Sequence, residues 1–199
     1  MNLSGYRINE YLLVLSPHEE LWKKVQKIKE EFAEKYKTAV AKHTKPHITL
    51  VSFAGWDMTE ERILQRLQVI AMGVAPFKVE LRDYGSFPSH TVFINVVSKL
   101  PIQNLVKQIK EAQRLLKLNP ENKPHFIEEP HLTICRKLKP WQYEQGWLEY
   151  SHRQFTGRFI ADGMLLLKRP WGEKQAFQIV RRFQFMNLPV TTRQGSLFA

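Results

Sequence analysis

The chain has 199 residues, of which 43% are hydrophobic and 25% charged, and this is the balance of a folded globular protein rather than a disordered one. Its formal net charge of +11 favours partners that carry phosphate, although a basic surface can also serve solubility alone. The single cysteine, Cys135, excludes an intramolecular disulfide and a cysteine-rich zinc site.

The first half of the chain predicts a strand, a helix, a strand, a helix and a strand, in that order. An apolar run before Pro17 and a run rich in β-branched residues after Pro46 indicate strands bounded by proline. Apolar residues that recur every three or four positions indicate helices with one buried face. Asp57 and Glu60 resemble a capping box at the start of the second helix. The five elements are expected at 11–15, 18–36, 47–53, 57–73 and 77–84.

The second half of the chain predicts the same order of elements and adds a final strand. The same patterns of apolar periodicity, glycine and proline set the boundaries. Gly172 is expected in the turn of the last hairpin. The elements are expected as a strand at 92–98, a helix at 102–118, a polar loop at 120–129, a strand from 131, a helix at 141–150, and strands at 159–169 and 175–185.

Matching elements in the two halves lie about 82–84 residues apart, which indicates an internal duplication. Two copies of this unit would give two lobes of sheet and helix related by a pseudo-twofold axis. We expect a single bilobal α+β domain over 1–199, with pseudo-repeat lobes at approximately 10–84 and 92–186. Equivalent residues of the two lobes would then face each other across a shared cleft.

A five-residue motif occurs once in each half and reads proline, histidine, aliphatic, threonine, aliphatic. It occupies 46–50 and again 130–134. On a strand, residues two apart share a face, so His47 points with Thr49, and His131 points with Thr133. The aliphatic neighbours would pack beneath helices. Two such faces would bring two imidazoles and two hydroxyls into one site.

A site of this kind suits attack on a phosphodiester. Imidazole titrates near neutrality, so one histidine can act as general base while the other acts as general acid, without a metal. Threonine hydroxyls can donate hydrogen bonds to phosphate oxygens as charge develops on them. Either motif alone could be a histidine bonded to nearby backbone, and zinc binding is a further alternative. The repetition favours a shared site, and no cysteine or carboxylate recurs beside the motifs at ligand spacing.

The two His-x-Thr motifs in a duplicated chain of this length resemble those of the two-histidine (2H) phosphoesterase superfamily, which includes 2′-5′ RNA ligases and cyclic nucleotide phosphodiesterases. The resemblance implies a bilobal duplicated fold in which two antiparallel sheets line a central cleft, with helices on the outside. It implies that His47 and His131 are the acid and base pair and that Thr49 and Thr133 bind phosphate oxygens. It also implies hydrolysis of 2′,3′-cyclic phosphates or 2′-5′ linkages with no metal or other cofactor.

The same resemblance adds three candidates for substrate binding. Arg136 matches an arginine that follows the second motif in the bacterial RNA ligase branch and would bind phosphate. Strict alternation puts Cys135 on the histidine face instead, so Arg136 reaches the site only if the strand ends or bulges. Phe87 matches an aromatic position near the cleft and could stack on a base, with Tyr84 as a second candidate, although either could instead pack the sheet edge. The segment 51–56 departs from the ligase branch, which leaves the subfamily open.

We therefore predict a metal-independent phosphodiesterase acting on 2′,3′-cyclic phosphate ends of RNA or nucleotides, or reversible 2′-5′ RNA ligation. The alternatives are a non-catalytic module that binds RNA or a nucleotide in the same basic cleft, a metal-dependent phosphoesterase, and a nucleotide-dependent RNA ligase. The expected partner is an RNA or nucleotide substrate, with no obligate protein partner, and a monomer is expected. No segment approaches the roughly 18 apolar residues that span a membrane, and the first residues lack a signal-peptide core. Together with the single cysteine, this leads us to expect no membrane association and a cytoplasmic location.

Overall fold

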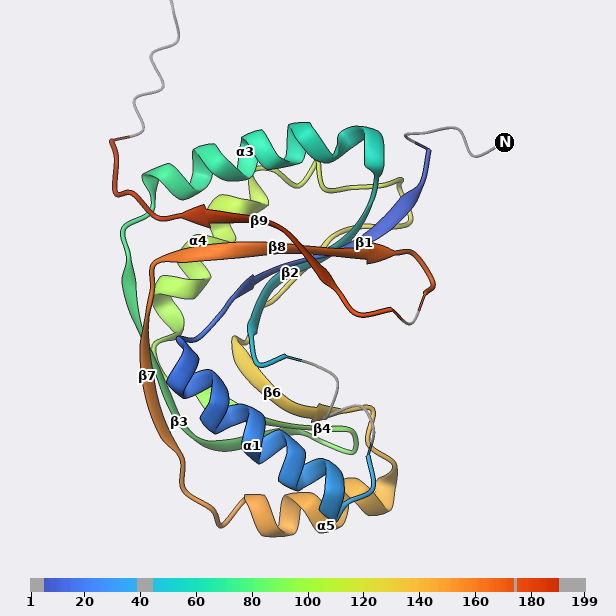
Figure 1. The fold of residues 1–199 in the computed structure, drawn as a ribbon, viewed down its shortest axis with the longest axis vertical. Helices are drawn as coiled ribbons and strands as arrows, with labels where there is room; N and C mark the ends of the chain where they lie inside the picture. Colours follow the sequence, from blue (N-terminus) through green and yellow to red (C-terminus); the bar gives the residue numbers. More distant parts are fainter. Residues whose placement is uncertain (1–5, 39–44, 174, 190–199) are drawn as a thin grey trace, which may run out of the picture.

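The structure, a computed structural model, describes residues 6–38, 45–173 and 175–189 and shows an α+β fold (Figure 1). The strands are β1 (Ile8–Leu15), β2 (Ile48–Trp56), β3 (Phe77–Phe87), β4 (Thr91–Val96), β5 (His125–Phe126), β6 (His131–Arg136), β7 (Thr156–Ala161), β8 (Gly163–Pro170) and β9 (Gln178–Gln184). The helices are α1 (Glu19–Lys35), α3 (Glu60–Gly73), α4 (Lys99–Lys110) and α5 (Pro140–Tyr150), with a 3-10 turn η1 (Asp57–Thr59) before α3.

All nine strands belong to one antiparallel sheet in the order β7-β3-β4-β6-β2-β1-β8-β9, with β5 paired to β2. The prediction of an α+β fold with antiparallel strands is confirmed, but the prediction of two separate sheets is wrong. The two motif strands, β2 and β6, pair directly through Ile48 and Leu132, and this pairing makes the sheet continuous.

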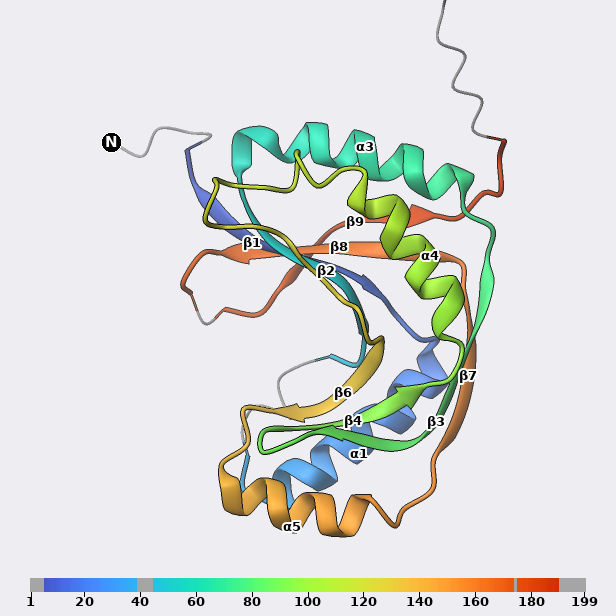
Figure 2. The same ribbon diagram turned by 180° about the vertical axis from the view of Figure 1, so that it is seen from behind.

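The sheet is strongly curved, and the helices lie on the outer side of the curve (Figures 1 and 2). Helix α1 packs on β6 and β7, and α5 packs on β4, at one end of the sheet. Helix α4 packs on β2, and α3 packs on α4 and β9, at the other end. No helix of the described part of the chain lies on the inner side of the sheet between these ends.

The two halves of the sheet exchange elements, so they do not coincide with the lobes expected at 10–84 and 92–186. Strand β3 pairs with β4 and β7, although it belongs to the first sequence unit, and β8 pairs with β1, although it belongs to the second. The helices are exchanged in the same way, because α1 covers β6 while α4 covers β2. Strands of the unit at 10–84 thus pair with strands of the unit at 92–186. The division of the chain into two lobes at these bounds stays a prediction.

One continuous hydrophobic core lies between the sheet and its helices. Helix α1 contributes Leu21, Val25 and Phe32 from a single face, as its apolar spacing predicted. Tyr11 of β1 extends into this core, and its hydroxyl donates a hydrogen bond of 2.9 Å to Glu60 at the start of α3. Among the helices of the described residues, none has the length and apolar character needed to cross a membrane.

The boundaries of several elements differ from those expected from the sequence. The single strand predicted at 159–169 is two strands, because the chain passes from the β3 edge to the β1 edge at Asp162. The capping box is wrong: Asp57 instead accepts a hydrogen bond from Asn9, and Thr59 occupies the N-cap of α3. The turn prediction is confirmed, since Gly172 has a φ of +76°, which favours glycine.

Replacing Leu132 by alanine tests the importance of the join between β2 and β6. Leu132 is fully buried, so Leu132→Ala should lower the free energy of unfolding by about 2–5 kcal/mol through lost burial and a residual cavity. The matched control is Leu148→Ala, because Leu148 is 70% exposed and should contribute less than about 0.5 kcal/mol. Urea unfolding of both variants measures the difference, and equal losses would contradict the structure.

Candidate active site

The two histidine motifs lie side by side in the middle of the sheet. His47 directly precedes β2, and His131 begins β6. Because the strands are antiparallel and Ile48 is opposite Leu132, the register places His47 beside Thr133 and Thr49 beside His131. Directly opposite residues have Cβ atoms about 4.5–5.5 Å apart, so each histidine neighbours the threonine of the other motif.

Burial follows the predicted alternation along both motifs. The aliphatic residues are fully buried on the side of the helices: Ile48, Leu50, Leu132 and Ile134. The four polar residues, His47, Thr49, His131 and Thr133, are partly exposed on the other, helix-free side. The structure therefore brings the four predicted residues together on one face that a ligand can reach. No motif residue lines either of the two described hollows, so the predicted central cleft stays a prediction.

Both imidazole rings are held in the same way. Nδ1 of His47 lies 2.7 Å from the Lys45 carbonyl oxygen, and Nδ1 of His131 lies 2.8 Å from the Glu129 carbonyl oxygen. A carbonyl can only accept, so Nδ1 carries the hydrogen in both rings. In the neutral form, Nε2 is then the atom that can accept a proton, and it is the ring nitrogen farther from the backbone.

The electrostatic surroundings of the two histidines differ. Burial, together with the smaller effects of Lys29, Arg136 and His131, lowers the pKa of His47 to about 4, and the hydrogen bond to the Lys45 carbonyl opposes this change. Burial also lowers the pKa of His131, but the Glu129 carbonyl and carboxylate oppose this change. His47 is therefore the more firmly neutral of the two at pH 7. That is the state required of a base.

Matching β-bulges follow the threonine in the two motif strands. In β6, Thr133 pairs with Phe93 and Cys135 with Val92, so Ile134 is an extra residue. In β2, Thr49 pairs with Val14 and Val51 with Leu13, so Leu50 is the extra residue. The sequence could not show whether either strand bulged, because the apolar run continues through both positions.

The bulge in β6 decides the positions of Cys135 and Arg136. Cys135 is 1% exposed on the helix side, where Sγ lies 3.2 Å from Oγ1 of Thr38. Strict alternation would have put Cys135 on the histidine face, but the strand bulges, and the extra residue shifts the alternation by one position. Arg136 is exposed and returns to the face of His131, and its charge acts on His47. The corresponding position after the bulge in β2 is Ser52.

Phe87 lies against His131, as the resemblance implied for a residue near the pair. The ring centroids of Phe87 and His131 are 4.9 Å apart, with nearly perpendicular planes. Phe93 was not predicted, but its ring is also 4.9 Å from His131 and 4.7 Å from Phe87. Gly85 makes room for it, since a Cβ there would lie 2.5 Å from the Phe93 ring. The alternation of β4 could have indicated Phe93 only once its pairing with Thr133 was known.

Tyr84 is not brought to the histidine pair. It pairs with Ile94, whose neighbour Asn95 pairs with His131, so Tyr84 lies on the opposite side of the sheet from His131. Its ring packs edge to face against Tyr150 of α5 at 5.0 Å. Tyr84 is therefore a core residue, and its prediction as a substrate-binding residue is corrected, because a sequence alone could not fix the face of β3.

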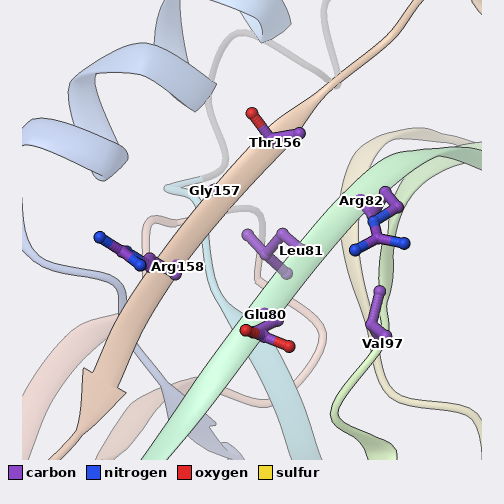
Figure 3. Close-up of a pocket in the computed structure, with 7 residues that line it drawn as sticks. All are labelled: Glu80, Leu81, Arg82, Val97, Thr156, Gly157 and Arg158. Atoms are coloured by element: carbon purple, nitrogen blue, oxygen red, sulfur yellow. The ribbon is translucent and has the colours of Figure 1, made fainter.

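Two hollows lie elsewhere on the surface. One, of about 400 Å³, lies at β3 and β7. Figure 3 shows its lining side chains, among which Arg82 and Arg158 point in different directions. Its lining residues are Glu80, Leu81, Arg82, Val97, Thr156, Gly157 and Arg158. A second hollow, of about 690 Å³, lies between α3 and the segment after α4, on the helix side of the sheet. Within the described ranges, no three His, Cys, Asp or Glu side chains gather so as to hold a metal ion.

The lowered pKa of His47 should make stability depend on pH. The unfolded chain takes up a proton near pH 6.5 but the folded chain only near pH 4, so acid favours unfolding between these values. The free energy of unfolding should fall as the pH falls through this window, by up to about 3 kcal/mol from His47. His47→Asn should remove that part of the loss, and the exposed-residue control His152→Asn should retain it. Urea unfolding at several pH values measures both, and identical pH dependence in His47→Asn and wild type would contradict the assignment.

Comparisons with known proteins agree on the fold. No curated protein sequence matches the chain significantly. The structure of TT0787 of Thermus thermophilus is 16% identical, with a TM-score of 0.59 over 89% of this chain and 98% of that one. Structures of E. coli LigT with NADP+ (14% identity, TM-score 0.58, 92% and 99% covered) and with 3′-AMP (12%, 0.60, 90% and 98%) are also similar. A profile of the 2′-5′ RNA ligase superfamily matches residues 17–173, and the chain therefore belongs to that superfamily.

Proposed function

We propose that the protein is a phosphodiesterase that opens 2′,3′-cyclic phosphate ends of RNA or nucleotides by acid–base catalysis with His47 and His131, without a metal. Membership of the superfamily places the chain among phosphoesterase- and ligase-like proteins. The observation that carries the proposal is the pairing of the two motifs on adjacent strands with both imidazoles on one face.

In the proposed reaction, water attacks phosphorus while Nε2 of His47 takes its proton. The bond from phosphorus to one ribose oxygen breaks, and His131 donates a proton to that oxygen, leaving a phosphomonoester. His47 suits the role of base because its pKa is about 4, so it is neutral at pH 7. The negative charge of bound phosphate favours protonation of a nearby imidazole. His131 suits the role of acid because the Glu129 carboxylate also favours its protonated form.

Thr49 and Thr133 are proposed to donate hydrogen bonds to the non-bridging phosphate oxygens. Each lies beside the histidine of the other motif, so a phosphorus atom between the imidazoles is within reach of both hydroxyls. Arg136 is proposed to add a positive charge at the edge of this group, where an exposed guanidinium can bind phosphate.

Phe87 is proposed to contact the base of the substrate. Its partly exposed ring beside His131 is placed to stack on a nucleobase, and such stacking contributes about 1–3 kcal/mol per base. The similar E. coli LigT has been solved with 3′-AMP, which is a ligand of the kind proposed. RNA or a nucleotide is therefore the proposed partner.

The reverse reaction, 2′-5′ ligation, would use the same residues, since both directions share one transition state. A non-catalytic module that binds RNA or a nucleotide remains the second candidate, and its distinguishing property is binding without turnover. The monomeric state and the cytoplasmic location stay predictions.

Turnover of the four 2′,3′-cyclic mononucleotides and a cyclic-ended RNA in excess chelator tests the proposal. His47→Ala and His131→Ala should each lower kcat by about 10²–10⁴-fold, because each removes one proton-transfer group. The control His152→Ala changes an exposed histidine outside the motifs and should retain wild-type turnover. Binding of all substrates without turnover would favour the binding module, and activity restored only by a divalent ion would favour metal catalysis.

The role of Phe87 has its own test with the same substrates. Phe87→Ala should raise KM about tenfold while kcat changes little, because stacking acts on the base and not on phosphorus. Phe87→Tyr should stay near wild type, since it keeps the ring. A fall in kcat at unchanged KM would instead indicate that the ring acts through His131.

A further inference from the structure

Lys29 is a buried cation directly behind the second motif. It belongs to α1, is 1% exposed, and its Nζ donates a hydrogen bond of 3.3 Å to the backbone carbonyl of Thr133. Lysine is almost never fully buried unless its charge has partners, because burial of the ammonium is costly. The proposed reaction assigns no role to this residue.

The contact lies at the bulge of β6. Thr133 immediately precedes the extra residue Ile134, where regular pairing with β4 is interrupted. Lys29 therefore holds the backbone at the point where the alternation shifts. That shift returns Arg136 to the histidine face, so Lys29 supports the position of both Thr133 and Arg136.

The charge of Lys29 also reaches the histidine pair. Burial, with a smaller contribution from Arg136 and against the opposing effect of Cys135, lowers the pKa of Lys29 to about 8, so the side chain is mostly protonated at pH 7. The groups of β6 that act on Lys29 are thus Cys135 and Arg136. At the start of β2, Lys29 is the first of the neighbouring charges that lower the pKa of His47.

Among the residues that the structure describes, no second buried cation lies behind the first motif. Helix α4, which packs on β2, buries only apolar side chains: Ile102, Leu105, Val106 and Ile109. The two motifs match in sequence, bulge and ring orientation, so the buried charge on one side breaks their equivalence.

We propose that Lys29 is a positioning residue that holds the β6 bulge and, from behind the sheet, adds a positive charge that acts on His47 and favours phosphate at the site. Its part in turnover rests on the proposed function, but its effects on His47 and on phosphate binding do not.

The test is an NMR titration of the His47 ring in the full chain, in wild type and in three variants of Lys29. Lys29→Met removes the charge and the donor, Lys29→Gln removes the charge but keeps a donor, and Lys29→Arg keeps the charge. The two neutral variants should raise the titration midpoint of His47, and Lys29→Arg should leave it near wild type. Lys23→Met is the control, since Lys23 lies on α1 with a side chain that is 67% exposed.

Inorganic phosphate provides a second measurement that needs no turnover. Its Kd should rise about tenfold in Lys29→Met and Lys29→Gln and stay unchanged in Lys29→Arg and Lys23→Met. Thermal unfolding verifies that each variant is folded. A folded neutral variant with unchanged His47 midpoint and unchanged Kd overturns the proposal. If neither neutral variant folds, Lys29→Arg decides. A His47 midpoint and a phosphate Kd that differ from wild type in this variant would also overturn the proposal.

The pH profile of kcat/KM connects the residue to catalysis. In Lys29→Gln, the acid limb should move to higher pH, because His47 is protonated more easily without the neighbouring cation. A purely structural role would lower the rate without moving the limb. If wild type turns over no cyclic phosphate, the proposed function fails, whereas the His47 titration and the phosphate Kd still decide the role of Lys29.

Discussion

The candidate site depends on the antiparallel pairing of Ile48 with Leu132. This pair joins β2 to β6 and so places two distant segments of the chain in one register. Both side chains are fully buried, so packing on the helix side holds the pair together. The histidine and threonine that flank each of these residues lie on the opposite face, because side chains alternate along a strand. Their positions therefore do not depend on contacts between the polar side chains. Stability and chemistry thus occupy the two faces of the same strands.

Acid–base catalysis by two histidines requires that like residues behave differently. The backbone around the two histidines is alike. A bulge follows the threonine in both motifs, and each Nδ1 forms a hydrogen bond with the carbonyl two residues earlier. The differences come from parts of the chain that the motif does not include. Arg136 stands where the first motif has Ser52, Glu129 acts on His131, and Lys29 acts on His47. The matching backbone of the two motifs supplies the geometry, and the residues around the motifs supply the different electrostatic surroundings.

The sequence was sufficient for the α+β class, for most elements, and for the common face of His47, Thr49, His131 and Thr133, because a period of two and a repeated motif depend only on local spacing. It was insufficient to predict the faces on which Arg136 and Cys135 lie. One extra residue in a strand moves every later side chain to the opposite face, and an apolar run does not reveal where such a residue is inserted. Tyr84 was wrongly predicted at the site, and Phe93 was not predicted there, for a related reason. Which face of β3 or β4 lies beside His131 depends on pairing between distant strands. Lys29 could not be found because a lysine on an amphipathic helix normally lies in solvent.

The exchange of elements between the two halves of the sheet also constrains how the chain acquires its structure. Helix α1 needs β6 to cover its apolar face, and β1 needs β8 as its outer neighbour. A nascent chain released from the ribosome in order therefore cannot complete the half β7-β3-β4-β6 until β7 has been made, or the half β2-β1-β8-β9 until β9 has been made. Pairings over such long sequence separations favour slow, highly cooperative folding. Two fragments cut between β3 and β4 would be expected to reach the native state only together, as complementing partners rather than as independent domains.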